Sequence, residues 1–394
     1  MRILTLTAAY PAPSEPGRAV YIENLTRALG RFGDGEVPTV VAPRVRPEDP
    51  LDEARRGVRV RRFRYPSGGR RLKEMRRPSP WALAAYFVSG LAVILEEIRR
   101  REPQVLLCHW VLPAGVLGAT ASKMLGVPLV LVAHGSDVNR YALASSAFAL
   151  LARGSTRQAR AVLAASEPLR RALVDRLSVP REKVSVLPMG VDDGLFPSLP
   201  AAEEDAERLR REARAALRLE PGRRTILFVG DLIPEKGVPE LLAAHAALRG
   251  LDVELCLIGD GPLRGGSTGG ERVRYLGRLP QQELPAWYRA ADLLVLPSHS
   301  EGSPVTLMEA LSLGTPVVAT AVGGIPDLLR EDAVGRLVPP GDVPALEKVL
   351  RELLSDPGSI ARMREGIRRN PQDFSARRRA VELREVLVGL GIER

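Results

Sequence analysis

The stretch Leu293–Thr320, LLVLPSHSEGSPVTLMEALSLGTPVVAT, decides the fold class. Its opening apolar run, Leu293–Leu296, predicts a buried strand, and a polar loop that contains Glu301 follows. Apolar residues at helical spacing then predict a helix from Pro304 to Leu313, and the β-branched run Pro316–Ala319 predicts another buried strand. Strand, helix and strand in this order are typical of a parallel sheet covered by helices.

The same alternation extends outward along the chain. A charged stretch at 201–219 interrupts it after Pro197 and Pro200, and we expect a domain boundary there with a surface helix of its own. Because 394 residues are many for one core, two doubly wound units in tandem are expected, with ligands at the carboxyl ends of strands in the cleft between them. The further predicted strands are 2–7, 39–42, 58–63, 105–108, 129–133, 161–164, 225–229, 253–258 and 272–276, and the further helices are 20–29, 81–100, 115–125, 238–248 and 284–290.

The junction between the Glu301 loop and its helix has the features of an anion site. Backbone N–H groups around Gly302–Val305 would point out of the helix start toward a phosphate, and Pro304 loses no hydrogen bond in a first turn. Glu309 lies about one and a half turns inside the helix. A docked diphosphate could then place a sugar at Glu301 and a ribose at Glu309, since carboxylates accept strong hydrogen bonds from hydroxyls. The alternative is a solvated loop glutamate and a half-buried helix glutamate.

The segment SEGSPVTLMEALSLGTPVVATAVGGIPDLL, which begins at Ser300, resembles the donor-site signature of the retaining glycosyltransferases of the GT4 family, which have the GT-B fold. The resemblance covers nearly the whole chain. It implies two facing doubly wound Rossmann-like domains with a cleft between them: residues 1–195 on the acceptor side, completed by a C-terminal helix near 375–394, and residues 196–374 binding the nucleotide-sugar donor. Other segments that match in order and spacing are HWVLPAG at 109–115, AHGSDV at 133–138, AASEPLR at 164–170, VLPMGVD at 186–192, VGDLIPEKGV at 229–238, LIGDGP at 257–262 and YLGRLP at 275–280.

The resemblance also implies roles for individual residues. Glu301 would hold hydroxyls of the donor sugar, Glu309 would hold the ribose, and Lys236 would neutralise the diphosphate. His134 would contact the donor sugar from the facing domain, and Asp137 would orient its loop. Without the resemblance, Lys236 is explained equally well as a surface lysine. His134 is then more simply explained as a structural histidine that follows a buried strand. We expect Glu301, His134 and Lys236 to be catalytic, and the other donor-binding positions to be Gly17, Arg18, Gly230, Gly259, Arg278, Leu279, Gly302, Ser303, Pro304, Val305 and Glu309.

Two positions depart from the family pattern. The chain has Asp231 after Gly230, where the family usually has an arginine that pairs with the donor phosphates. Because a carboxylate repels a diphosphate, Asp231 must point away, cap the next segment or signal an altered phosphate contact. Arg18, directly after Gly17, could restore the missing charge. The second departure is mild: Asp327 stands where a glutamate is usual.

The implied reaction is transfer of a hexosyl group from a nucleotide-diphosphate sugar to an acceptor hydroxyl with retention of anomeric configuration. Lys236 and helix N-termini would stabilise the leaving diphosphate. The chain contains no D-x-D, so we expect no metal and no other cofactor. A sugar-nucleotide epimerase or a phosphorylase is the rival within the fold. A nicotinamide enzyme is disfavoured, because the first strand is followed by no G-x-G-x-x-G. A two-lobed binding protein would be exported, and we expect no secretory leader.

Composition adds expectations about location. Cys108 and Cys256 lie in apolar strand-like runs, which indicates buried free thiols in a reducing cytoplasm. The apolar stretch Trp81–Leu95 is shorter than the ~20 residues that a membrane span needs, so it predicts a crossover helix or an interfacial one.

Charge is also unevenly distributed. The segment 44–77 holds thirteen Arg or Lys against five Asp or Glu, within a net charge of +10. It could meet an anionic membrane, or it reflects the arginine-rich composition of the whole chain. Nucleic acid is not expected, because no recognition motif accompanies the charge. We expect a cytoplasmic enzyme, a monomer or weak dimer, possible peripheral contact with the inner membrane face, and a glycan, lipid or small-molecule acceptor.

Overall fold

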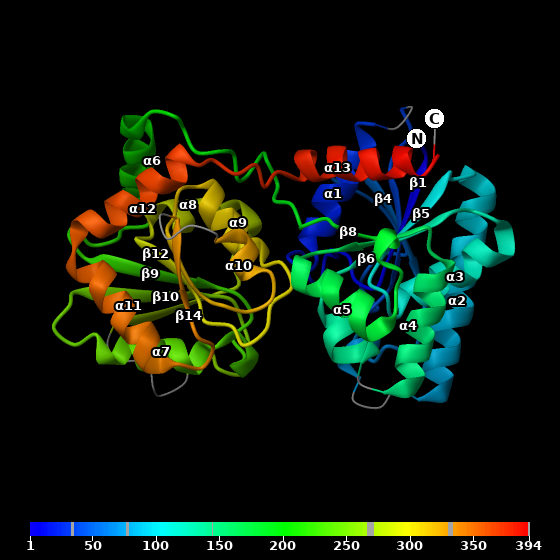
Figure 1. The fold of residues 1–394 in the computed structure, drawn as a ribbon, viewed down its shortest axis with the longest axis horizontal. Coiled ribbons are helices and arrows are strands. Elements are labelled where there is room, and N and C mark those ends of the chain that lie inside the picture. The colour runs from blue at the N-terminus through cyan, green and yellow to red at the C-terminus, as the bar shows by residue number, and fades with distance from the viewer. Residues whose placement is uncertain (33–34, 76–78, 144, 266–271, 330–333, 393–394) are drawn as a thin grey trace. The chain divides into compact units, whose positions relative to one another are not determined.

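The computed structural model describes residues 1–32, 35–75, 79–143, 145–265, 272–329 and 334–392, which divide into two compact units (Figure 1). The first unit comprises Met1–Gly190 and Ala376–Arg394, and the second comprises Val191–Ser375. The division falls at 190/191, where the sequence suggested 195/196. The C-terminal helix α13 (Ala376–Gly389) belongs to the first unit, in which it packs on α1 (Val20–Gly30).

The first unit contains an eight-stranded sheet in the order β3-β4-β2-β1-β5-β6-β7-β8, in which only the β3–β4 pair is antiparallel. Every residue of β5 and β6 is buried, which explains why both strands read as continuous apolar runs. The strands are β1 (Ile3–Thr7), β2 (Thr39–Pro43), β3 (Asp52–Arg55), β4 (Val58–Phe63), β5 (Val105–His109), β6 (Leu129–Ala133), β7 (Ala161–Ala164) and β8 (Val184–Val186). The other helices are η1 (Leu72–Glu74), α2 (Pro80–Arg101), α3 (Ala114–Leu125), η2 (Asp137–Ala142), α4 (Ser146–Gln158), α5 (Glu167–Leu177) and η3 (Arg181–Lys183).

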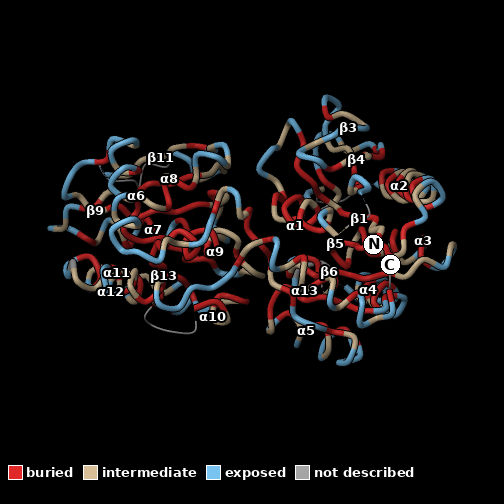
Figure 2. Tube along the Cα trace, turned by 90° about the horizontal axis from the view of Figure 1, so that it is seen from above, coloured by how far each residue is buried: buried red, intermediate tan, exposed pale blue. Residues whose placement is uncertain are grey.

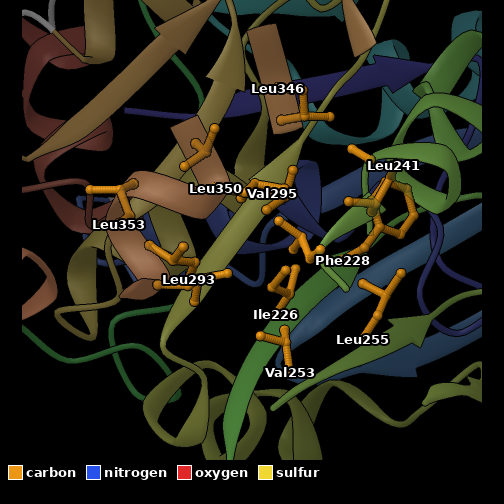
Figure 3. Close-up of a cluster of buried hydrophobic side chains, with 14 of the residues drawn as sticks. Ile226, Phe228, Leu241, Val253, Leu255, Leu293, Val295, Leu346, Leu350 and Leu353 are labelled. Carbon is orange, nitrogen blue, oxygen red and sulfur yellow. The ribbon is translucent and has the colours of Figure 1, made fainter. Parts of the chain in front are cut away.

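The second unit contains a six-stranded, fully parallel sheet in the order β11-β10-β9-β12-β13-β14. Its core packs Phe228 of β9 and Val295 of β12 against Leu350 of α11, all fully buried (Figure 3). The strands are β9 (Arg224–Val229), β10 (Val253–Ile258), β11 (Val273–Gly277), β12 (Leu293–Leu296), β13 (Val317–Thr320) and β14 (Gly335–Val338). The helices are α6 (Glu203–Ala216), η4 (Pro234–Lys236), α7 (Val238–Ala247), η5 (Gln281–Glu283), α8 (Leu284–Ala290), α9 (Val305–Ser312), α10 (Ile325–Leu328), α11 (Val343–Ser355) and α12 (Pro357–Arg369).

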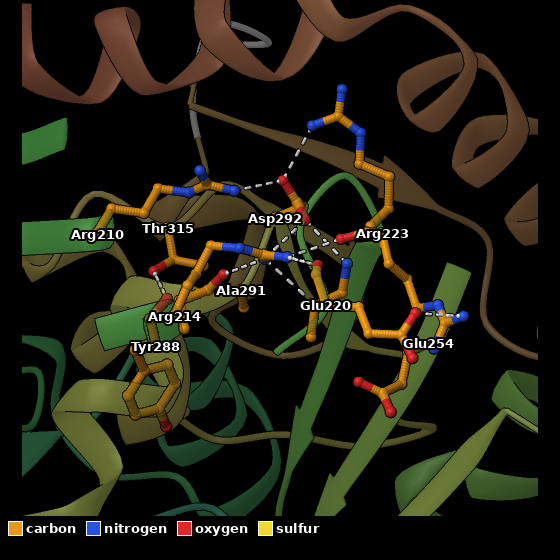
Figure 4. Close-up of polar contacts among 12 residues, drawn as sticks. Arg210, Arg214, Glu220, Arg223, Glu254, Tyr288, Ala291, Asp292 and Thr315 are labelled. Atoms are coloured by element: carbon orange, nitrogen blue, oxygen red, sulfur yellow. Dashed lines mark hydrogen bonds and ion pairs between the residues drawn. The ribbon is translucent and has the colours of Figure 1, made fainter. Parts of the chain in front are cut away.

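The charged stretch expected at the domain boundary forms α6, which lies inside the second unit. Asp292, 1% exposed, anchors it by accepting hydrogen bonds from the Arg210 side chain at 2.7 Å and from the backbone N–H of Thr225 at 2.8 Å (Figure 4). Arg214 of the same helix donates to the carbonyl of Ala290 at 3.0 Å. The arginines of α6 therefore bind the helix to the segment before β12 and, through Asp292, to the start of β9. The sequence predicted a surface helix here but not these contacts.

Helix α2 lies on the surface of the first unit, where it packs on β4 and α3. Its buried residues Ala82, Tyr86, Gly90 and Ile94 recur every four positions, so one face is covered while the remainder is open to solvent (Figure 2). Among the described residues, α2 is the one helix with the length and composition to cross a membrane. Cys108 and Cys256 are buried free thiols, as expected.

Candidate donor site

The predicted donor-binding residues of the second unit gather at one edge of its sheet. Gly230 directly follows β9, Gly259 follows β10, and Arg278 follows β11, while Glu301 lies in the loop after β12. Because all six strands are parallel, these carboxyl ends meet at the same edge, which is where open α/β sheets bind ligands. The structure therefore brings together residues that are distant in the sequence.

The loop of Glu301 is held by close backbone contacts on both sides. Gly237, with φ of 68°, is so near the next loop that a Cβ atom would lie 2.0 Å from the carbonyl oxygen of Pro297. A Cβ atom on Gly323, with φ of 54°, would lie 1.7 Å from the carbonyl oxygen of Glu301. The backbone N–H of His299 also donates to the carbonyl of Glu235 at 3.0 Å. Only glycine fits at both contacts, so the sequence fixes this loop through residues outside it.

The carboxylate of Glu301 accepts two hydrogen bonds at this edge. Lys236 Nζ lies 2.6 Å from its Oε1 atom, and Ser298 Oγ donates to the same oxygen at 2.8 Å. The side chains of Glu301 and Lys236 are 10% and 30% exposed, so the pair is reachable from solvent. Lys236 belongs to the short helix η4, which ends at Gly237. The two residues expected to contact sugar and diphosphate are thus neighbours, a contact that the sequence spacing did not show.

Glu309 is buried rather than half-buried, with 5% of its surface exposed. It lies inside α9, and its Oε2 atom accepts a hydrogen bond from the hydroxyl of Tyr288 at 2.7 Å. The Tyr288 carbonyl in turn accepts from the Thr315 hydroxyl at 2.7 Å. Burial raises the pKa of Glu309 to about 7, although the hydrogen bond from Tyr288 acts in the opposite direction. The carboxylate is therefore oriented by Tyr288 and costly to ionise.

The start of α9 differs by one residue from the expected helix. The helix begins at Val305, because Pro304 has ψ of 114°, an extended conformation, and serves as the N-cap residue. The first-turn N–H groups still point out of the helix start beside Gly302. Ser303 places a buried hydroxyl there that has no partner among the described residues. This end of α9 is suited to an anion.

Asp231, which follows β9, lies near a cation at the end of β11, two strands away in the sheet. Its Oδ1 atom lies 3.9 Å from a guanidinium nitrogen of Arg278, and both side chains are about half-exposed. The carboxylate that replaces the family arginine is therefore partly neutralised within the second unit. Arg18, suggested as the compensating charge, lies in the first unit, where its backbone N–H donates to the Glu15 carbonyl at 3.2 Å. Leu279 is half-buried beside Arg278.

The loop directly after β6, in the first unit, contains further residues that were predicted to be functional. Asp137, 1% exposed, accepts backbone hydrogen bonds from His134 at 3.0 Å, Gly135 at 2.9 Å and Val111 at 2.7 Å. This is the loop-orienting role expected for Asp137. The His134 ring lies against Trp110, with ring centroids 4.7 Å apart, and is half-buried.

Gly17 lies in an exposed turn before α1. A Cβ atom at Gly17 would meet no other atom within 4 Å, so the packing of the protein does not require glycine there. Any requirement for glycine at this position would come from a ligand that approaches the backbone.

Sequence reasoning missed three residues that position the expected ones: Ser298, Tyr288 and His109. Ser298 and Tyr288 contact Glu301 and Glu309, and His109 contacts His134 at 3.0 Å. Tyr288 looks like any core aromatic on an amphipathic helix, and Ser298 like any loop serine. His109 opens the HWVLPAG segment, which was a signal of the family but not of a role. Among the described residues, no group of three or more His, Cys, Asp or Glu side chains could hold a metal ion.

The chain matches two family models. Residues 210–370 match glycosyl transferases group 1, and residues 17–190 match the glycosyl transferase 4-like domain. The D-inositol 3-phosphate glycosyltransferase of Salinispora arenicola (strain CNS-205) is 31% identical over 98% of this chain and 91% of the relative. TuaC of Bacillus subtilis (strain 168), provisionally named a teichuronic acid biosynthesis glycosyltransferase, is 31% identical over 83% of each chain.

Solved structures show the same fold. Sucrose-phosphate synthase from Thermosynechococcus elongatus has a TM-score of 0.77 at 23% identity, covering 99% of both chains. Anabaena HepE, in complex with UDP-glucose, has a TM-score of 0.73 at 20% identity, covering 99% of this chain and 100% of that one. With two Rossmann-like units, the matching models and relatives that align over most of their length, the chain belongs to the GT4-like, group 1 glycosyltransferases and is a retaining enzyme of GT-B fold that uses a nucleotide-sugar donor.

Proposed function

We propose that this glycosyltransferase moves a hexosyl group from a UDP-hexose to a hydroxyl of an acceptor for cell-envelope or lipid-linked glycan synthesis. The observation that carries the proposal is the Glu301 carboxylate, held by Lys236 and Ser298 at the carboxyl edge of the second sheet. The UDP-glucose complex of HepE supports the uridine base, and the name of TuaC supports an envelope glycan.

In the proposed reaction, Glu301 accepts hydrogen bonds from hydroxyls of the donor sugar while Lys236 turns to the diphosphate. The bond between the anomeric carbon and the phosphate oxygen breaks, and the acceptor oxygen bonds the same face of that carbon. The acceptor's proton passes to the departing phosphate oxygen. Lys236 and the N–H groups at the start of α9 stabilise the charge that develops there. This arrangement requires no metal ion, so a chelator should leave turnover unchanged; loss of turnover with a chelator would contradict it.

The remaining donor contacts follow from the edge of the sheet. We assign the ribose to Glu309, whose carboxylate Tyr288 orients. Arg278 and Leu279 lie at the end of β11 and are assigned to the base, and Gly230 and Gly259 to close backbone approach. For residues of the first unit we keep the roles that the family resemblance implies: a hydroxyl of the donor sugar for His134, and the diphosphate for Gly17 and Arg18.

For the acceptor side we propose peripheral contact with an anionic membrane through α2. Trp81 and Val88 are seven residues apart, so they lie on the same side of the helix, and they are 74% and 70% exposed. Arg99 and Arg100 are exposed in the last turn of the helix, where they can bind lipid phosphates. The basic segment 44–77 should contribute less to membrane binding than its charge suggests, because six of its arginines already form ion pairs within the protein. These are Arg55, Arg56, Arg59, Arg61, Arg62 and Arg71.

Vesicle sedimentation tests the membrane contact. Wild-type protein should sediment with anionic vesicles and not with neutral ones, and the double variant Trp81→Glu, Val88→Glu should stay in solution. Val388→Glu, at an exposed position of α13, is the matched control and should behave as wild type. Equal sedimentation of the double variant would contradict the proposal. We also propose that the protein is cytoplasmic. We further propose that it is a monomer or weak dimer, and light scattering without lipid measures this oligomeric state.

The donor proposal is tested by thermal stabilisation with UDP-, GDP- and ADP-hexoses. We expect UDP-hexoses to raise the melting temperature most, and Glu301→Ala to abolish the part of that rise that exceeds the rise with UDP alone. Release of free UDP only in the presence of an acceptor would separate transfer from epimerisation. Absence of any shift with all three donor classes would contradict the proposed function.

A further inference from the structure

Two histidines meet at the carboxyl ends of the neighbouring strands β5 and β6. His109 is the last residue of β5, and His134 directly follows β6. His109 Nδ1 lies 3.0 Å from His134 Nε2, while the ring centroids are 5.2 Å apart and the ring planes differ by 25°. Because the two nitrogens are much closer than the centroids, the rings meet edge to edge along the N···N line. This is the geometry of a hydrogen bond between imidazoles.

The burial of His109 decides the direction of that hydrogen bond. The side chain has no exposed surface, and burial lowers the pKa of His109 to about 3, so the ring is neutral with one N–H and one lone pair. Its other nitrogen, Nε2, is buried and has no partner in the part of the chain that the structure describes. A proton on Nε2 would be an orphaned buried donor, which folded proteins rarely contain, whereas a lone pair is tolerated better. The proton therefore sits on Nδ1, and His109 donates to His134.

The surroundings of His134 fix its ring in the same sense. Its ring contacts the rings of Trp110 and Tyr21, at centroid distances of 4.7 and 5.3 Å, and its backbone N–H donates to Asp137. These contacts hold the plane of the ring and the loop. The in-plane hydrogen bond from His109 selects which ring nitrogen of His134 keeps a lone pair.

We propose that His109 is a positioning residue, which keeps Nε2 of His134 as an acceptor and so holds the proton of His134 on Nδ1, as a donor toward the donor sugar or its diphosphate. The consequence for the sugar rests on the proposed role of His134. A histidine free in solution exchanges its proton between both nitrogens, so fixing it on one removes an unproductive form of the site.

The same hydrogen bond opposes protonation of His134. A protonated His134 would donate through Nε2, and His109 could accept only by moving its own proton to the buried Nε2. Among the described residues, Tyr21 of α1 lies against His134, Asp137 of η2 accepts its backbone N–H, and Asp137 and Arg18 act electrostatically on Tyr21. Asp137 would favour a cation, but its oxygens are already engaged by three backbone N–H groups. The hydrogen bond from His109 therefore favours the neutral Nδ1–H form of His134.

Imidazole ¹H–¹⁵N spectra test the proposal directly, because the chain has only four histidines. In the wild type, His109 and His134 should both carry their proton on Nδ1. In His109→Leu, His134 should change to the Nε2–H form or to a mixture. His109→Asn, whose amide can donate from nearly the same place as Nδ1, should restore the Nδ1–H form. His245→Asn, at a histidine of α7 in the second unit, is the matched control and should leave His134 unchanged.

Kinetics at saturating donor then test the consequence. We expect kcat of His109→Leu to fall at least tenfold, with most activity recovered in His109→Asn. A wild-type spectrum with the His134 proton on Nε2 would overturn the proposal, even if His109→Leu does not fold. A tautomer change without any change in kcat would leave the hydrogen bond standing and instead contradict the role proposed for His134.

Discussion

The loop after β6 in the first unit and the loop after β12 in the second hold their functional side chains by different means. In the first, His134 is supported by Asp137 of the loop and by His109 at the end of β5, which are both buried and need not move for His134 to act. In the second, Glu301 is held by Lys236, whose side chain is 30% exposed and whose charge a diphosphate would also attract. The contacts that hold His134 are thus in place before the donor binds. In the second loop, by contrast, Glu301 would exchange its contact with Lys236 for hydroxyls of the donor sugar. Changes to the buried supports of the first loop should affect folding as well as turnover, and changes in the second loop should affect turnover with little effect on folding.

The largest effect is expected at the exchanging loop. Glu301→Ala should lower kcat by about 1000-fold, because it removes charge-assisted hydrogen bonds to the reacting sugar. The melting temperature should change little, since Lys236 can be solvated when unpaired. Steady-state transfer assays and calorimetry check both. Glu235→Ala, at an exposed glutamate beside Lys236, should keep wild-type kcat. Loss of folding in Glu301→Ala would break the comparison between the loops.

The buried loop should respond in stability first. Asp137→Ala leaves three backbone N–H groups without their acceptor and should lower the free energy of unfolding of the first unit by about 3–5 kcal/mol. Asp137→Asn keeps one acceptor oxygen and should cost less. Urea unfolding measures the difference, with exposed Ser136→Ala as the control. A variant Asp137→Ala that is as stable as wild type but inactive would mean that Asp137 acts on the substrate.

Glu309 sharpens the comparison, because it is a buried group within the exchanging region. Its pKa is raised to about 7, so the folded state binds a proton that the unfolded chain has already lost above about pH 4.3. Its contribution to stability should therefore fall as pH rises from that value through 7. Glu309→Gln should raise the free energy of unfolding at pH 8 by about 2 kcal/mol while weakening UDP-hexose binding. Wild-type affinity for UDP should rise over the same pH range. Melting curves and titrations at several pH values check this; a variant less stable at pH 8 would contradict it.

The smallest effect is expected at Ser298. Ser298→Ala removes one neutral hydrogen bond to Glu301, while the Lys236 contact remains. We expect about a tenfold loss of kcat, equivalent to about 1.4 kcal/mol, and unchanged affinity for UDP. Transfer kinetics measure it. An effect as large as that of Glu301→Ala would show that Ser298, rather than Lys236, sets the position of the carboxylate.

The sequence predicted the elements whose pattern is local. Apolar runs gave strands such as β6 and β9, and the Glu301–Pro304 loop was located before a helix, within one residue of its start. No strand was predicted at β3, because Asp52–Arg55 is a polar edge strand without an apolar face. Pairings across strands, such as Lys236 with Glu301, Tyr288 with Glu309 and Asp231 with Arg278, depend on how distant segments are brought together. The type of site was therefore predictable, and its internal partners were not.

Titration calorimetry with UDP-glucose and UDP tests most directly whether Glu301 binds the sugar and Lys236 the diphosphate. Glu301→Gln should lose about 100-fold in affinity for UDP-glucose and keep its affinity for UDP within about threefold, because only the charge-assisted hydrogen bonds to the sugar are lost. Lys236→Met should weaken the binding of both ligands. Wild-type affinity of Glu301→Gln for UDP-glucose, or of Lys236→Met for UDP, would contradict the account.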